Sequence, residues 1–521
     1  MKRGRAARLA LGPALAALVL CGSFPAAADL GLPGGLNLTY QTEVSYGTSG
    51  GGDKQRIFEN WLNADYAHGP VTAGLRFVGF DPPDPVIYPH GPDSWGVDFG
   101  YAEVGARRFN LRVGSFYTLF GRGLALRAYE NRTLRVDTNL LGARGTLTLP
   151  GGELTALLGR SVEGNAEDAG RGRTEPIAGI DLQHRLPLGF EAGGSLVSTG
   201  VRSQGDEREL EPQRLKAGRL SRSLLGIDLY GEFARVDGPA TSAGSAAPNV
   251  HGHGLYGAAS TSIGHLGFVL DLKDYDRLVF QNEAGIAYIV PPAALREHQF
   301  NLLNRHPHQL DTADERGFQL EANYNTDRLS RRGLTSFLAN WSVTRNHDTA
   351  VQRGNHFDDA YLEFQQELGG GAVAIAGLSW QRSFLTPLTP DPLRTLWTPL
   401  ADLRLPLGER YGVHLQLEHQ HVSADLVGEY DTEFLVVEGS RSPDLTASLL
   451  VEVTNKSAKQ LSLESEEDTR FFGGEVTYQI AERHNLTLFG GARNAGFVCV
   501  GGVCRYEPAF DGAELRLVTR F

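Results

Sequence analysis

The chain has 521 residues, of which 41% are hydrophobic and 21% charged, and its formal net charge is −12. A negative chain repels nucleic acid, so this charge disfavours a nucleic-acid partner. The mean hydropathy is −0.24, and no run after residue 28 is apolar and long enough for a spanning helix, which excludes a helical membrane protein.

Residues 1–28 have the parts of a secretory signal peptide. Four basic residues lie among the first eight, an apolar run follows from Leu9 to Leu20, and three alanines end at Ala28. Cleavage after Ala28 removes four positive charges and no acidic residue, so the net charge becomes −16. Cys21 offers a lipid anchor as an alternative. Leu20 stands before it, where a small residue is usual, and we therefore expect no lipidation.

Apolar and polar residues alternate along the rest of the chain in segments of about ten residues. Examples are 36–46, 71–80, 409–420, 473–480, 485–493 and 513–521. Successive side chains of a strand point to opposite faces, so each segment has an apolar face and a polar face that often carries charge. A β-sandwich needs two apolar sheets facing each other. Repeated strands of this length instead favour a membrane-spanning barrel.

Short and long connections alternate along most of the chain. Short connections lie at 150–152, 186–189, 264–267, 369–371, 405–410, 440–444 and 481–485, and long ones at 81–94, 163–173, 237–250, 277–316, 347–356 and 455–469. Membrane barrels have tight periplasmic turns and long outer loops. We therefore predict that residues 29–521 form one all-β domain, a single transmembrane antiparallel barrel of about 24 strands, within a range of roughly 18–26. Residues 107–135 and 203–224 are hard to divide into strands, and 495–511 fall on the outer side.

The last strand ends on an aromatic residue. In a barrel, Leu515 and Leu517 would face lipid and Phe521 would lie in the inner aromatic girdle. Such an ending also resembles the signal that is recognised by the barrel-assembly machinery of gram-negative outer membranes. That resemblance implies the assembly machinery as a partner.

Residues 115–139 do not fit a strand. Their notable residues are Arg122, Arg127, Tyr129, Glu130, Arg132 and Arg135. Gly121 and Gly123 allow a tight bend or positive φ. We predict a loop that folds into the lumen, forms the pore constriction and favours anions. In the alternative, arginine–carboxylate pairs only fasten the loop to the wall.

Residues 277–316 form the longest connection. Pro291 and Pro292 break it, and AALREHQFNLLN has the pattern of a short helix. Such a segment can be a lid, a plug or a docking loop. His298, His306 and His308 suggest a metal site. Pro307 separates the last two histidines and no cysteine joins them, so we favour a packed loop without metal.

Cys499 and Cys504 are the only cysteines after the signal peptide. In an exported chain they predict a disulfide, with a CxxxxC metal site as the alternative. His419 and His421 lie near acidic and hydroxyl residues (Glu418, Ser423 and Asp425), as in a barrel hydrolase. Such groupings arise easily by chance, so we predict no enzyme and no cofactor. An acidic stretch at 463–468 would suit calcium, but a solvated loop is the commoner case.

Two blocks carry a family resemblance. FGRGLALRAYENR (120–132) is followed by VDTNLLGARG (136–145), and PPAALREHQFNLLNRHPH (291–308) leads to ERGFQLEANY (315–324). They resemble an uncharacterised family of gram-negative outer-membrane β-barrel proteins, a domain-of-unknown-function family. The resemblance implies the barrel and the outer membrane, and it implies no activity. TonB-dependent transporters carry a large N-terminal plug domain, whereas alternation begins here at Leu36.

These patterns predict a porin-like channel or transporter for small hydrophilic solutes, surrounded by outer-membrane lipid. One alternative is a structural or docking component of an outer-membrane secretion or assembly complex. Another is a transporter of a hydrophobic ligand, which the charged inward faces oppose.

Overall fold

The computed structural model describes residues 34–49, 54–81, 95–161, 175–203, 206–239, 249–282, 286–347, 356–384, 393–424, 428–455 and 469–521. The predicted signal peptide, Asp425 and the acidic stretch 463–468 lie outside these residues. Among them, no helix is long and apolar enough to cross a membrane.

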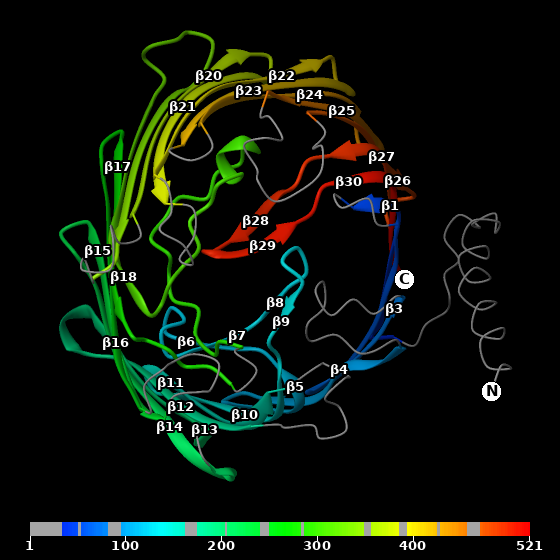
Figure 1. Cartoon of the computed structure of the whole chain (residues 1–521). Helices are drawn as coiled ribbons and strands as arrows, with labels where there is room; N and C mark the ends of the chain where they lie inside the picture. Colours follow the sequence, from blue (N-terminus) through cyan, green and yellow to red (C-terminus); the bar gives the residue numbers. More distant parts are fainter. Residues whose placement is uncertain are drawn as a thin grey trace, which may run out of the picture.

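One antiparallel sheet of 24 strands closes into a barrel (Figure 1). Its first half consists of β1 (Leu36–Ser49), β2 (Lys54–His68), β3 (Val71–Asp81), β4 (Trp95–Ala106), β5 (Phe109–Phe116), β10 (Leu140–Leu149), β11 (Gly152–Ser161), β12 (Pro176–Arg185), β13 (Phe190–Ser203), β14 (Asp206–Leu224), β15 (Ile227–Pro239) and β16 (Asn249–Ile263). Its second half consists of β17 (Leu266–Asp276), β18 (Asp314–Thr326), β19 (Thr335–Arg345), β20 (His356–Gly369), β21 (Ala372–Phe384), β22 (Leu393–Leu407), β23 (Tyr411–Ala424), β24 (Gly428–Arg441), β25 (Leu445–Thr454), β26 (Arg470–Ile480), β27 (His484–Arg493) and β30 (Phe510–Arg520). The predicted fold class and strand number are confirmed.

Each barrel strand pairs with its predecessor and its successor along the sheet, and β1 pairs with β30 to close the ring. In that closing pair Thr39 lies opposite Arg520 and Glu43 lies opposite Arg516. We call the wall formed by β26, β27, β30, β1, β2, β3 and β4 the closure seam. Closure leaves no strand edge whose amides would stay unpaired in hydrocarbon.

Residues 107–135 and 203–224, which are hard to divide into strands from the sequence, fold in different ways. Residues 206–224 form the single 19-residue strand β14. Residues 107–135 contain a turn, β5 and then short pieces that leave the wall. These pieces are β6 (Thr118–Phe120), β7 (Leu126–Ala128), β8 (Glu130–Asn131) and β9 (Val136–Asp137).

Short turns and long connections lie at opposite ends of the barrel, as the loop lengths predict. Gly69 and Pro70 join β2 to β3, and Gly370 and Gly371 join β20 to β21. The chain end lies at the turn end, where the Phe521 N–H donates to the Leu38 carbonyl at 2.9 Å. The long connection between β17 and β18 leaves from the other end.

The outward face of the barrel is apolar. Leu75 is 50% exposed, Leu196 55%, Leu362 59% and Leu449 51%. These side chains come from strands all around the ring, and their neighbours in sequence face the lumen. An apolar surface of this extent is unfavourable in water. It fits the lipid-facing band of a transmembrane barrel.

Leu449 and Ser448 test this assignment, because they are neighbours on β25 that point to opposite faces. Leu449→Arg places a charge in lipid, and we expect a loss of about 2–4 kcal/mol of barrel stability. Ser448→Arg faces Glu438 and Glu475 across the neighbouring strands and is expected to be tolerated. Urea unfolding in lipid, followed by electrophoretic mobility, measures both. Equal losses would contradict the assignment of the two faces.

Three segments from the long-loop end fold into the lumen (Figure 1). The first is 117–139 with β6 to β9, and the second is 277–313 with the 3-10 turn Leu302–Asn304. The third is 494–509 with the hairpin of β28 (Gly496–Val500) and β29 (Val503–Glu507). The prediction of a lumen partly filled by loops is confirmed. The sequence placed 495–511 on the outer side, but this hairpin turns back inside the barrel.

Candidate functional site in the lumen

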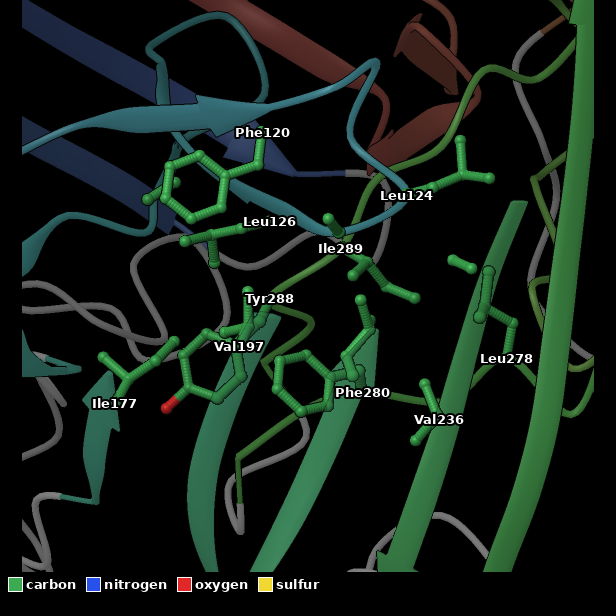
Figure 2. Close-up of a cluster of buried hydrophobic side chains, with 14 of the residues drawn as sticks. Phe120, Leu124, Leu126, Ile177, Val197, Val236, Leu278, Phe280, Tyr288 and Ile289 are labelled. Atoms are coloured by element: carbon green, nitrogen blue, oxygen red, sulfur yellow. The ribbon is translucent and has the colours of Figure 1, made fainter. Parts of the chain in front are cut away.

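A dry core fixes the first two infolded segments to the wall opposite the closure seam (Figure 2). Infolded Phe120, Leu124, Leu126, Leu278 and Phe280 are at most 1% exposed. They pack on inward side chains of β11 to β17, namely Leu157, Ile177, Val197, Leu215, Val236, Tyr256 and Tyr275. Each buried side chain of this size contributes about 1.5–3 kcal/mol, so this contact holds both segments firmly on the wall.

The same two segments also bind each other through backbone hydrogen bonds. The Arg127 N–H donates to the Tyr288 carbonyl at 2.8 Å, and the Val290 N–H donates to the Gly123 carbonyl at 3.1 Å. Gly123 has φ +92°, and a Cβ there would lie 2.4 Å from the Val290 oxygen. Glycine is therefore required at this approach, as its place in the sequence suggested.

A second dry contact fastens residues 300–303 to β19 to β25. Phe300 and Leu303 pack on Tyr361, Ile375 and Leu400, and Leu302 packs on Phe434 and Val436. Within AALREHQFNLLN the structure forms only the 3-10 turn, so the helix expected there is wrong.

The Glu418 carboxylate, which is fully buried, holds this turn in place. It accepts the Asn301 N–H at 2.9 Å and the Leu302 N–H at 2.8 Å. Glu418 thus accepts two backbone N–H groups that would otherwise have no hydrogen-bond partner against the wall.

Ion pairs fasten the hairpin β8–β9 to the closure seam. Arg76 of β3 donates to both oxygens of Glu130, at 3.0 and 2.8 Å, and Arg132 donates to Glu130 at 2.8 Å. Arg135 lies 3.3 Å from Glu59, which is 1% exposed. The fastening network that the sequence offered as an alternative is therefore present.

The pKa values of the two carboxylates of this hairpin, Glu130 and Asp137, are shifted in opposite directions. Burial raises the pKa of Glu130, but the charge of Arg76 and its hydrogen bonds with Arg132 and Arg76 outweigh burial, so the pKa lies below its ordinary value. Burial raises the pKa of Asp137 above its ordinary value, although Asn139 donates hydrogen bonds to it. Glu130 is thus the ionised anchor of the hairpin.

Arg122 and Arg127 lie further along the lumen, on the hairpin β6–β7. Arg122 donates to the Tyr256 hydroxyl at 3.0 Å and stacks over Tyr230 at 4.2 Å. Arg127 stacks over Tyr129 at 4.6 Å. The six residues of the predicted constriction are thus divided between two places, and the constriction stays a prediction.

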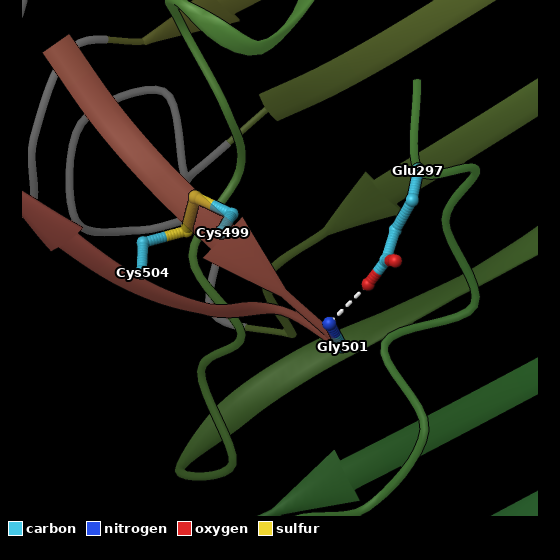
Figure 3. The surroundings of a disulfide bond; sticks show 4 residues. All are labelled: Glu297, Cys499, Gly501 and Cys504. Carbon is cyan, nitrogen blue, oxygen red and sulfur yellow. Dashed lines mark hydrogen bonds between the residues drawn. A yellow bond between two sulfur atoms is a disulfide. The ribbon is translucent and has the colours of Figure 1, made fainter. Parts of the chain in front are cut away.

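The third infolded segment is a hairpin braced by its cysteines (Figure 3). The Cys499 and Cys504 sulfurs are 2.09 Å apart. The Gly501 N–H donates to Glu297, and the Leu310 N–H donates to the Gly502 carbonyl at 3.0 Å. The hairpin is therefore docked on the second infolded segment.

The three histidines of the second segment have separate partners. His298 bonds Asp359 at 2.8 Å, and His308 bonds Glu315 at 2.9 Å. His306 lies 3.0 Å from an Arg394 nitrogen. In the described part of the chain, no group of three or more His, Cys, Asp and Glu residues is placed to hold a metal ion.

The grouping considered for a hydrolase is split by the pleat of β23. Glu418 is buried on the lumen face, whereas His419 and His421 bond Glu433 and Asp431 on the outward face. Adjacent residues of a strand cannot share a site on one face.

Among the described residues, cavities lie between the infolded segments and the wall. One of about 480 Å³ lies between the closure seam and the hairpins β8–β9 and β28–β29, and we call it the seam cavity. A turn-side cavity of about 390 Å³ lies between β10 to β14 and β6 with the residues that follow it. A central cavity of about 360 Å³ lies between the infolded segments and the wall from β16 to β21, and Arg122, Arg127 and Cys499 line it.

Residues 36–521 match the model of a family of unknown function (DUF6029). The chain belongs to this family. The resemblance to an uncharacterised barrel family is thereby confirmed, and the match covers the whole barrel. A search of curated proteins found no match.

Several solved structures are similar to this member of DUF6029. The P pilus usher (PapC) translocation pore has a TM-score of 0.42 and 11% identity, over 93% of this chain and 99% of that chain. OccK5 (OpdH) of Pseudomonas aeruginosa has a TM-score of 0.38 and 18% identity, over 67% and 94%. A BenF-like porin from Pseudomonas fluorescens Pf-5 has a TM-score of 0.38 and 12% identity, over 71% and 97%. Each similarity concerns the fold alone.

The C-terminal residues of this DUF6029 barrel alternate between the two faces of β30. Leu515 and Leu517 pair with Val44 and Thr42 on the face opposite the Arg516–Glu43 ion pair. Phe521 lies edge-on to His484 at the turn end. Their recognition by the assembly machinery stays a prediction.

Proposed function

We propose that the chain is a porin-like channel of the gram-negative outer membrane that passes small hydrophilic solutes. The observation that supports this most is the seam cavity, a charged space left inside an apolar-faced barrel. Charged lumen walls hold water and admit polar solutes. The infolded segments narrow the passage and would set its size limit.

A docking or assembly component is the second candidate. It is favoured by the two dry contacts that hold the infolded segments against most of the wall. A fully closed lumen would leave the barrel as a scaffold. A hydrophobic-ligand transporter has less support, because charged residues line the seam cavity.

Single-channel recording of the refolded barrel in a planar bilayer separates the first two candidates. We expect stable current steps, because the seam cavity carries charge and is not filled by apolar side chains. A barrel that is shown to be folded by its electrophoretic mobility but gives no current would overturn the channel. Co-purification with a defined envelope complex would then support the docking function.

A further inference from the structure

The infolded segments bind the wall in two different ways. From β11 to β17, and again from β19 to β25, apolar side chains of the segments pack directly on the wall. Of the hydrophobic clusters in the described residues, none joins an infolded segment to the closure seam. There the segments are held by ion pairs, such as Arg76–Glu130 and Arg135–Glu59, and by a ring contact, in which Tyr117 stacks on Phe99 of β4 at 5.1 Å.

This asymmetry decides where water can pass. A dry cluster packed to interior density leaves no path for an ion or a solute. A wall contact made of ion pairs keeps polar groups next to water-sized space, as in the seam cavity. We infer that the solute passes off-centre, along the closure seam, and that the seam cavity binds small solutes carrying both a positive and a negative charge. This inference rests on the proposed channel function.

The far border of this path is the disulfide hairpin. Its Gly501 and Gly502 dock on the second infolded segment, while Val498, Arg505 and Glu507 border the seam cavity. The hairpin therefore stands between the seam cavity and the central cavity, which Cys499, Gly501 and Gly502 line. It leaves the solute between one fixed hairpin and the wall.

The charges of the seam cavity point to the solute class. Six arginines and eight acidic residues are among the described residues that line it. On the wall they form pairs, with Arg493 to Glu514 at 2.6 Å and Arg516 to Glu43 at 2.7 Å. A simple anion at either arginine also meets a carboxylate, which repels it. A zwitterion can bind both members of a pair with charge-assisted hydrogen bonds.

Two matched threonines test the route. Thr487 lines the seam cavity and Thr155 lines the turn-side cavity. Each is the fourth residue of its strand, and each bonds a threonine of a neighbouring strand, at 3.1 Å to Thr477 and 3.2 Å to Thr146. Each is changed to Cys and treated with a sulfonate-bearing thiol reagent, while the native disulfide stays oxidised.

We expect the modified T487C channel to lose most of its current and the modified T155C channel to keep it. Mass spectrometry shows that both variants have reacted. Complete modification of T487C with unchanged current, or block of T155C instead, would overturn the seam route but leave the channel standing. An unmodified protein that gives no current would overturn the channel and the route together.

A second measurement uses Arg122 and Arg127, which line the central cavity. The constriction that the sequence predicted requires ion selectivity to change when both become Ala. If the solute passes along the closure seam, the double variant and the unchanged protein should have the same reversal potential in a salt gradient. A clear shift would overturn the route.

Liposome swelling tests the solute class with alanine and lactate, which are nearly equal in size. We expect alanine, a zwitterion, to enter faster than lactate, an anion. Arg493→Gln with Glu514→Gln removes one charge pair and should reduce this preference. Lactate entry equal to or faster than alanine entry would overturn the solute class, whatever the route.

Discussion

Leu126→Asp is expected to open the sealed side of the lumen and raise the single-channel conductance several-fold. Leu126 is fully buried between the infolded segments and the wall. A carboxylate there is buried without a partner, which costs several kcal/mol. The hairpin β6–β7 would move away from the wall at this point, so that the carboxylate reaches water. The 24 paired strands would remain, since their hydrogen bonds do not involve this side chain.

Leu119→Asp is the control for this result. Leu119 belongs to the same hairpin but is 58% exposed, so an aspartate there stays in water. Its conductance should match that of the unchanged protein. If both variants conduct alike, the dry core does not seal the lumen.

Glu418→Ala is expected to release the turn at Leu302–Asn304. The change leaves the Asn301 and Leu302 N–H groups without their acceptor. A buried unpaired donor, as the Leu302 N–H would become, costs roughly 1–3 kcal/mol. Hydrogen exchange of these two amides should therefore be faster by roughly tenfold or more.

Two further variants make the Glu418 result specific. Glu418→Gln keeps one acceptor oxygen and should show a smaller increase in exchange. Glu438→Ala removes another glutamate that faces the lumen from the neighbouring strand β24, and should leave both amides protected. Equal exchange in all three variants would contradict the role of Glu418.

Strand number and loop asymmetry could be predicted from the sequence because both are local. A strand shows its two faces in alternating residues, and a barrel must alternate short turns with long loops. Residues 115–139 could be recognised as infolded because leucines and phenylalanine interrupt a charged loop. Leu124 and Leu126 are now seen in the dry core.

The partners of the infolded residues could not be predicted, because they depend on the curvature of a closed wall. Arg76 and Glu130 are 54 residues apart, and Asn301 and Glu418 are 117 apart. No pattern in the sequence joins such pairs. The arginines of 115–139 suggested an anion site for the same reason, since the partner of Arg135, Glu59, lies on β2, and the tyrosines that Arg122 contacts lie on β15 and β16.

The alternation of short and long connections predicts that the hairpin β28–β29 lies outside. Its return into the lumen depends on Glu297 and Leu310, which belong to a segment far away in sequence. The histidines at 419 and 421 were grouped with Glu418 by proximity alone. The pleat of one strand separates them.

The closing pair β1–β30 has a consequence for how the barrel forms. Every other pair in the ring joins strands that are neighbours in barrel order, and all but the three pairs that flank the infolded segments can form as hairpins of low contact order. The pair β1–β30 joins the two ends of the barrel and must wait until the last strand is available. The strands that carry the main dry core, β10 to β17, can assemble before that step. The side of the wall that forms last is therefore the side that none of the large apolar clusters of the infolded segments reaches. In this protein the opening would follow from the order of folding, at the place where the first and last strands meet.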